Sequence, residues 1–133
     1  MSLPEVIQPD GWSRPKGYAN AVVAEGRLLF IAGQIGWDAE GVFPSDDFVA
    51  QARQALRNVL TLLHAAGAEP AHLVRMTWYV TDRQEYLRRS KELGAAYREI
   101  LGAVYPAMTA VEVSALIEAR AKVEIECTAV IPG

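Results

Sequence analysis

The chain has 133 residues, of which 51% are hydrophobic and 22% are charged, and its formal net charge is −3 at pH 7. This length fits one domain with a sizeable core, and the composition excludes a disordered chain. The acidic balance gives no general attraction to phosphate backbones, so nucleic acid is not the first partner to expect. No apolar run approaches the ~20 residues that cross a bilayer, and no basic region followed by an apolar stretch opens the chain. We therefore expect a single domain over residues 1–133 and a soluble, cytoplasmic protein with no membrane partner.

The first predicted elements are two strands. Residues 18–23 precede a Glu-Gly turn signal at positions 25–26, and residues 27–32 then form a β-rich run that ends at Gly33. Two β-rich runs on either side of such a turn are typical of a hairpin. The sequence thus predicts a hairpin over residues 18–32.

Two amphipathic helices are predicted next. Apolar residues recur at helical spacing from Asp46 to Ala66, behind a capping aspartate and ahead of Gly67, which favours a helix end. Residues 84–101 repeat the pattern and stop at Gly102. The run between these helices, residues 74–80, alternates and is rich in β-branched and aromatic side chains, so it predicts a strand.

The last two predicted strands span about residues 108–113 and 122–131. The resulting order, ββαβαββ, indicates an α+β protein in which both helices cover one face of a mainly antiparallel sheet. Acidic and apolar side chains alternate in these last strands, so the other face cannot be uniformly apolar. Such a mixed surface suits packing around a symmetry axis against copies of the same chain.

The closing third carries the most specific motif. Residues 105–113 read Tyr-Pro-Ala-Met-Thr-Ala-Val-Glu-Val, and residues 122–130 read Lys-Val-Glu-Ile-Glu-Cys-Thr-Ala-Val. Together with Phe-Ile-Ala-Gly-Gln-Ile at 30–35 and the helical run at 51–59, this sequence resembles the Rid (reactive intermediate deaminase) family, also called YjgF/UK114. The resemblance covers nearly the whole chain. It implies a RidA-like domain with the chorismate-mutase-like fold of the bacillus type, and a homotrimer whose subunit boundaries hold pockets for a small-molecule ligand.

The resemblance also implies site residues, two of which keep the family's residue type. Tyr18 matches a tyrosine that lines the ligand pocket, and Glu124 matches the acidic residue assigned to positioning a hydrolytic water. Glu124 lies in a strand where acidic residues alternate, which is also the pattern of a solvated sheet face.

Other implied positions differ from the family. Ala32, beside Gly33, replaces a serine that contacts the ligand in several members. Ser90 stands where well-studied deaminases have an asparagine, and Ala110 where they have a cysteine. The implied ligand-binding set therefore includes Ala32, Gly33, Ser90 and Ala110 with altered chemistry.

The largest departure is Met108. Most characterised members carry an arginine here, which grips the carboxylate of an imine or enamine acid, and a thioether cannot replace it. Loss of a charge-assisted hydrogen bond costs roughly 1.5–3 kcal/mol. We expect a more apolar pocket and a larger, neutral or aromatic ligand, for which Trp37 and the pair Trp78–Tyr79 would supply flat surfaces. Core packing is the alternative interpretation of Met108, and at least one residue of the alternating pair must face the core.

The sequence leaves open whether another cation compensates for this loss. Arg14, Arg75 and Arg120 are candidates from the same or an adjacent subunit. Arg120 precedes the last strand and could reach a subunit boundary.

The first functional hypothesis is an enamine or imine deaminase that hydrolyses a carbon–nitrogen double bond and releases ammonia. Glu124 would hold the water and relay its proton, Tyr18 would close one wall, and backbone groups near Ala107 and Ala32 would orient the nitrogen. The alternative is a trimeric ligand-binding protein without turnover. A third hypothesis, a ribonuclease or translation inhibitor, is disfavoured by the acidic charge and the lack of a basic aromatic stripe.

No metal or cofactor is expected. His64 and His72 have no cysteine or second acid at ligand spacing, and residues 33–36 lack the flanking pattern of a dinucleotide or phosphate loop. Cys127 is the single cysteine and lies in an alternating apolar strand, which predicts a buried, inert thiol.

Overall fold

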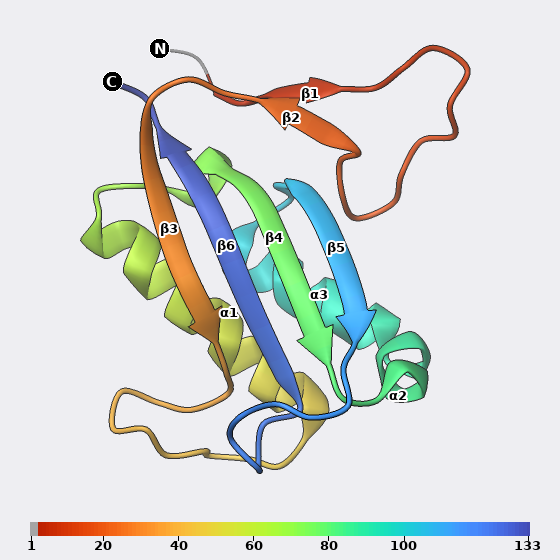
Figure 1. Ribbon diagram of the computed structural model, residues 1–133, viewed down its shortest axis with the longest axis vertical. Coiled ribbons are helices and arrows are strands. Elements are labelled where there is room, and N and C mark those ends of the chain that lie inside the picture. The colour runs from red at the N-terminus through yellow and green to blue at the C-terminus, as the bar shows by residue number, and fades with distance from the viewer. Residues whose placement is uncertain (1–2) are drawn as a thin grey trace.

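The computed structural model describes residues 3–133 and has two layers. Four strands form one sheet in the order β3-β6-β4-β5, with helices α1 and α3 against one face (Figure 1). The other face is left uncovered by the described chain. The bounds are β3 Arg27–Gln34, β6 Val123–Ile131, β4 Leu73–Val80, β5 Ala107–Glu112, α1 Phe48–Ala65 and α3 Ser90–Leu101. β6 is antiparallel to both neighbours and β4 is parallel to β5, so the expected α+β class and mainly antiparallel sheet are confirmed.

Helix α1 begins and ends close to the predicted residues. The Asp47 side chain accepts a hydrogen bond from the Ala50 backbone N–H at 2.9 Å, which satisfies one of the free donors of the first turn. Gly67 follows the helix with a φ of 76°, a conformation that glycine adopts without steric cost.

The predicted second helix is two helices. Residues Arg83–Arg88 form α2, and α3 starts at Ser90, with Arg89 between them at φ −105° and ψ 19°. The Arg89 guanidinium donates to Asp47 at 2.6 Å and to Glu92 at 2.9 Å, which ties the junction to the start of α1. Periodicity alone could not reveal the break, because the apolar side continues across it.

The predicted hairpin over residues 18–32 is wrong. Strand β2, Ala21–Val23, pairs instead with β1, Glu5–Ile7, a strand that the sequence analysis missed, and β3 pairs with β6. Gly26 permits a close approach at the start of β3, since a Cβ there would lie 2.8 Å from the carbonyl carbon of Ile131. This close approach directs the chain onto β6, and Figure 1 shows the β1–β2 ribbon standing apart from the main sheet.

The segment before β2 returns to the opposite edge of the sheet. The Ala19 backbone N–H donates to the Pro106 carbonyl at 2.9 Å, and Ala19 forms a parallel bridge with Ala107 at the start of β5. Residues 16–18 are therefore held near the β5 edge.

The hydrophobic core lies between the sheet and the helices. Alternate residues of the sheet face the helices and are fully buried, as are the facing residues of α1; they include Met76, Val123, Ile125, Ala129, Leu56, Val59 and Leu63. The uncovered face carries the other half of the alternation. There Leu28 and Phe30 are 62% and 73% exposed, opposite Val130 and Thr128 of β6.

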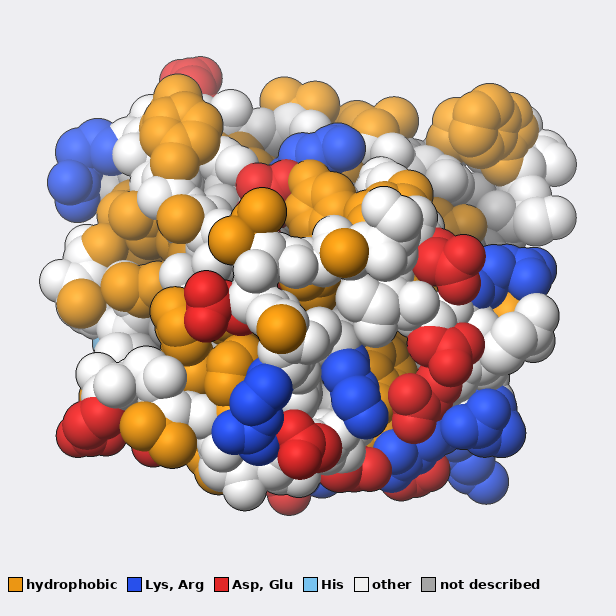
Figure 2. Space-filling view, turned by 60° about the horizontal axis from the view of Figure 1, so that its bottom comes forward, with side chains coloured by type: hydrophobic (Ala, Val, Ile, Leu, Met, Phe, Trp, Pro, Cys, Tyr) orange, Lys and Arg blue, Asp and Glu red, His pale blue; other side chains and the backbone are white. Residues whose placement is uncertain are grey.

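Charges of both signs are mixed over the molecular surface. Figure 2 shows acidic and basic side chains interspersed on the face that it presents. Several are paired, including Arg120 with Asp46 at 2.8 Å, and Arg53 with Glu99. No helix of residues 3–133 is long and apolar enough to cross a membrane.

Candidate functional site

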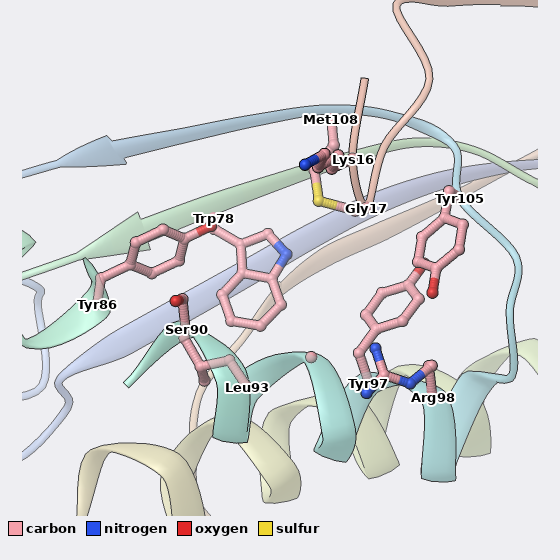
Figure 3. Close-up of a pocket in the computed structure, with 11 residues that line it drawn as sticks. Lys16, Gly17, Trp78, Tyr86, Ser90, Leu93, Tyr97, Arg98, Tyr105 and Met108 are labelled. Atoms are coloured by element: carbon pink, nitrogen blue, oxygen red, sulfur yellow. The ribbon is translucent and has the colours of Figure 1, made fainter. Parts of the chain in front are cut away.

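A cavity of about 190 Å³ lies between β4, β5 and α3, on the helix side of the sheet. We call it the aromatic pocket (Figure 3). Its lining includes Trp78, Tyr86, Ser90, Tyr97, Tyr105 and Met108, with Lys16, Gly17, Leu93, Gly94 and Arg98 completing it.

Strand register places Met108 in this pocket. Met108 is opposite Met76 in the parallel β4–β5 pair, and Met76 is fully buried against the helices. Residues paired across a sheet share a face, so Met108 also points toward the helices, and it is half-buried against the core. Ser90, the first residue of α3, lines the same pocket. The structure thus brings together two of the positions implied by the resemblance.

Two aromatic pairs form the walls of the pocket. Trp78 and Tyr86 meet edge to face, with ring centroids 6.2 Å apart, and Tyr97 stacks on Tyr105 at 5.4 Å. Burial raises the pKa of the Tyr86 and Tyr97 hydroxyls, so both rings stay neutral at physiological pH. Of the three aromatic residues expected to offer flat surfaces, Trp78 lines this pocket, whereas Tyr79 points to the opposite face and Trp37 does not line it.

Trp78 also carries a donor without a partner. The residue is 4% exposed, and its indole Nε1 is the one buried side-chain nitrogen or oxygen of residues 3–133 that makes no hydrogen bond. Buried polar groups are nearly always paired, so this unpaired N–H is an exception within the described chain.

Sequence reasoning missed both cations at the pocket. Lys16 and Arg98 line it, and no carboxylate of the described chain lies within ion-pair distance of either one. A sequence signal existed in the spacing of Ser90, Gly94 and Arg98, which places them on one side of α3. The pocket therefore retains positive charge without an arginine at position 108.

Glu124 lies on the uncovered face of the sheet, against Gly33. A Cβ on Gly33 would lie 2.6 Å from the carboxyl carbon of Glu124, so only glycine permits this approach. Tyr79 is opposite Glu124 in the β4–β6 pair, and its hydroxyl donates to Glu126. This hydrogen bond to a carboxylate raises the pKa of Tyr79.

A shallow hollow of about 420 Å³ lies beside Glu126 on the same face. It is lined by Ala32, Phe30, Arg75, Thr77, Glu126 and Thr128 among others. Ala107 begins β5 opposite Arg75 and shares this face of the sheet. Ala32, Gly33, Ala107 and Glu124 therefore belong to the uncovered face, and Met108 and Ser90 to the helix side.

The remaining implied residues lie elsewhere. Tyr18 is 41% exposed in the segment at the β5 edge. Ala110 is opposite Trp78 near the far end of β5 and is exposed. Trp37 packs against Phe43, with ring centroids 6.0 Å apart, in a small cluster beside the main core. One chain alone does not bring Glu124 and Met108 together, because the sheet separates them.

None of the three arginines considered from sequence lines the aromatic pocket. Arg75 lies at the hollow on the uncovered face, and Arg14 is exposed. Arg120 donates to Asp46 and stacks over the Phe43 ring with its guanidinium 5.3 Å from the centroid.

Cys127 is buried, as predicted, and burial raises the pKa of its thiol to about 12. Both histidines contact Glu69 in the turn that follows α1. His72 Nδ1 accepts a hydrogen bond from the Glu69 backbone N–H at 3.0 Å, and His64 Nε2 lies 3.5 Å from the Glu69 carboxylate. Over residues 3–133, no three side chains of histidine, cysteine, aspartate or glutamate gather as a metal site would require.

Comparison with known proteins assigns the family. A family model described as Endoribonuclease L-PSP matches residues 13–131. A crystal structure of a Rid-family protein from Yersinia pestis is 33% identical and has a TM-score of 0.87, covering 98% of this chain and 100% of that one. The chain belongs to the Rid family.

Sequence relatives of this Rid protein include a named deaminase. A RutC family protein of Pyrococcus horikoshii is 34% identical over 115 residues, which cover 86% of this chain and 88% of that protein. A human protein named 2-iminobutanoate/2-iminopropanoate deaminase is 31% identical over 114 residues, covering 85% of this chain and 79% of the relative. The sequence-based assignment to the Rid family is thereby confirmed.

Proposed function

We propose that this Rid protein is an imine or enamine deaminase that hydrolyses a carbon–nitrogen double bond and releases ammonia. The observation that carries the proposal is the Glu124 carboxylate, which packs over Gly33 where no side chain obstructs it. The name of the human relative supports the reaction class. The net charge of −3 disfavours RNA as substrate, so we do not propose the ribonuclease activity named in the family description.

The chemistry requires only a positioned water and a proton relay. An iminium carbon is already electrophilic, so Glu124 takes a proton from water as the water oxygen bonds to that carbon. The proton then passes to the nitrogen of the carbinolamine. As the carbon–nitrogen bond breaks, Glu124 takes the remaining hydroxyl proton, so that a carbonyl product and ammonia leave, and this proton ends on the ammonia as ammonium. No metal or cofactor is needed to balance this step.

We further propose that the active unit is a homotrimer with its sites between subunits. Glu124 and Met108 are on opposite faces of one sheet, so a site that uses both requires a second copy of the chain. Exposed Leu28 and Phe30 make the uncovered face partly apolar, as an interface core would be. In this arrangement the aromatic pocket of one subunit would approach the Glu124 face of its neighbour.

Met108 is proposed to alter specificity toward ligands with a large apolar body. The family's arginine would occupy space that Met108 leaves to an apolar group between the aromatic walls. Small 2-imino acids would then bind weakly, since they fill little of the cavity and their carboxylate has no arginine on β5 to bind.

Ammonia release from freshly generated imines tests the proposal. The panel contains imines of amino acids with small side chains and imines of amino acids with aromatic side chains. The Glu124→Gln variant serves as the control for enzymatic turnover. We expect turnover of the aromatic members and its loss, by at least about 100-fold, in the variant. Four altered positions, Ala32, Ser90, Met108 and Ala110, favour the alternative of a ligand-binding protein without catalysis. Binding without any ammonia release would support that alternative.

The Met108→Arg variant tests the specificity proposal in the same assay. Arginine would fill apolar space and add a charge-assisted contact, so the ratio of activity on small over aromatic imino acids should rise about tenfold or more. An unchanged ratio would show that residue 108 does not set specificity. The Met108→Leu variant, which keeps the volume and apolar character, should behave as the wild type.

A further inference from the structure

We propose that Arg98, assisted by Lys16, holds an anionic group of the ligand in the aromatic pocket, so that the ligand is a carboxylate with a flat, aromatic body. The inference deepens the proposed function and rests on it for the identity of the site. The sequence favoured a larger, neutral or aromatic ligand; the proposal keeps the aromatic body and adds a negative charge, for which helix α3 supplies the cation that β5 lacks.

The backbone of α3 allows the Arg98 guanidinium to lie along the pocket. Gly94 is one helical turn before Arg98, and a Cβ there would lie 3.3 Å from Arg98 Nη1. Figure 3 shows the Arg98 side chain reaching back along α3 toward the middle of the helix. A side chain at position 94 would make the guanidinium shift by a few tenths of an ångström, so glycine leaves room for it along the helix.

The electrostatics of the lining favour an anion. Its charged members are Lys16 and Arg98, and no aspartate or glutamate is among the described residues that form it. Lys16 and Arg98 are both exposed, so solvent screens part of their attraction for a carboxylate. A planar guanidinium can bind a carboxylate with two parallel hydrogen bonds, which adds directional specificity.

The orphan N–H of Trp78 is an independent sign of a polar ligand group. It is buried in the wall of the same cavity and has no partner in the described chain. In the view of Figure 3 the indole nitrogen points away from Tyr86 and Ser90. The nitrogen is closed off from the cavity, so a ligand oxygen would reach this donor after a shift of the surrounding side chains.

The size of the cavity fits one aromatic ring. An apolar cavity of about 150 Å³ accommodates benzene, and the aromatic pocket has about 190 Å³. The remaining volume suits a small anionic group near Arg98, while Lys16 lies across the pocket beside Met108 (Figure 3). Tyr97 and Tyr105 on one side, with Trp78 on the other, provide faces on which a ring can stack.

Binding of a stable probe tests the inference without turnover. Phenylpyruvate is the carbonyl product that hydrolysis of the corresponding aromatic imino acid would give, and its methyl ester lacks the charge. Calorimetric titration of the full chain should show tighter binding of the acid than of the ester. Arg98→Gln should weaken acid binding about tenfold to a hundredfold and leave ester binding unchanged. Arg98→Lys, which keeps the charge, should weaken acid binding by a smaller factor.

Arg57→Gln is the matched control, since Arg57 is exposed on α1 and does not line the pocket. Arg98 is itself exposed, so thermal unfolding of Arg98→Gln should match the wild type. The Trp78 indole N–H resonance, assigned with Trp78→Phe, should shift on addition of the acid. Equal binding of acid and ester, or full acid binding by Arg98→Gln, would overturn the inference.

The two proposals fail in different ways. If phenylpyruvate binds through Arg98 but no imine is turned over, the deaminase proposal fails and the assignment of Arg98 stands. If ammonia is released with the same efficiency by wild type and Arg98→Gln, the assignment of Arg98 fails and the deaminase proposal stands.

Discussion

Gly33 and Glu124 illustrate how a single residue without a side chain can define a candidate site. The glutamate carboxylate occupies the volume that a methyl group at position 33 would need. Gly33 does not adopt a positive φ, so its role is to allow close approach and not an unusual backbone conformation. A substitution there acts on the position of Glu124 with little direct effect on backbone strain.

Gly33→Ala should therefore lower turnover nearly as much as Glu124→Gln, because the new methyl displaces the carboxylate. Kinetics and thermal unfolding of both variants check this. The double variant Gly33→Ala with Glu124→Asp offers a sharper test, since the shorter side chain makes room for the methyl. It should be more active than Gly33→Ala alone, and equal activities would show that crowding is not the cause.

Cys127 should be unreactive toward thiol reagents in the folded protein. Burial raises its pKa to about 12, so at pH 8 almost all of the residue is the neutral thiol, and the nucleophilic thiolate is scarce. Labelling with iodoacetamide at pH 8 should be at least ten times slower in buffer than in denaturant, as mass spectrometry can measure. Equal rates would contradict the buried environment.

At the scale of elements, the predictable part of the fold was the part fixed by neighbours in sequence. Helix α1 follows from a cap, an apolar stripe and a terminal glycine, all within about 20 residues. The partner of β2 did not follow, because β2 pairs with β1 and β3 pairs with β6, a strand about 100 residues later in the chain. Arg98 was missed for a similar reason, since its pocket also requires strands β4 and β5.

The Asp47 cap should make a measurable contribution to α1. Asp47→Ala should lower the free energy of unfolding by about 1 kcal/mol, because the Ala50 N–H loses its acceptor. Asp47→Asn keeps an acceptor for the Ala50 N–H and loses only the charge that pairs with Arg89. It should therefore lower the free energy of unfolding by less than Asp47→Ala does. Urea unfolding of the three proteins at pH 7 checks this order, and an asparagine variant as unstable as alanine would contradict it.

The same residue predicts a pH dependence. The hydrogen bond from Arg89 lowers the pKa of Asp47 below its ordinary value of 3.8. A carboxyl whose folded pKa is depressed stabilises the fold above its unfolded pKa, and this contribution is lost as pH falls through the folded pKa. The stability difference between wild type and Asp47→Asn should thus be constant above about pH 5 and shrink in more acidic solution.

At the scale of the whole molecule, the sheet has one buried face and one face that the described chain leaves open. The open face combines exposed Leu28 and Phe30 with Glu124, Glu126 and Arg75. A large apolar ring in such a position favours association, and nearby charges can fix its geometry. The proposed trimer would cover this face and would also bring Glu124 of one subunit to the aromatic pocket of another.

Phe30→Glu should therefore convert the oligomer to monomers, because it buries an unpaired charge in the proposed interface. Light scattering after size-exclusion chromatography measures the mass. Ile117→Glu is the control, since Ile117 is 96% exposed and lies in the loop before β6, outside the sheet. Monomeric wild type, or an intact oligomer of Phe30→Glu, would contradict the proposed use of this face.

The sequence by itself determined the α+β class, the main helices, the family and the apolar residue at position 108. These features follow from local periodicity and from short motifs, which can be recognised without knowledge of distant contacts. Tertiary structure alone decided that Glu124 and Met108 lie on opposite faces of the sheet, and that Arg98 and Lys16 meet at one cavity. The physical reason is that strand register and helix packing join residues far apart in the chain, and the chemistry of the pocket depends on those joined surfaces.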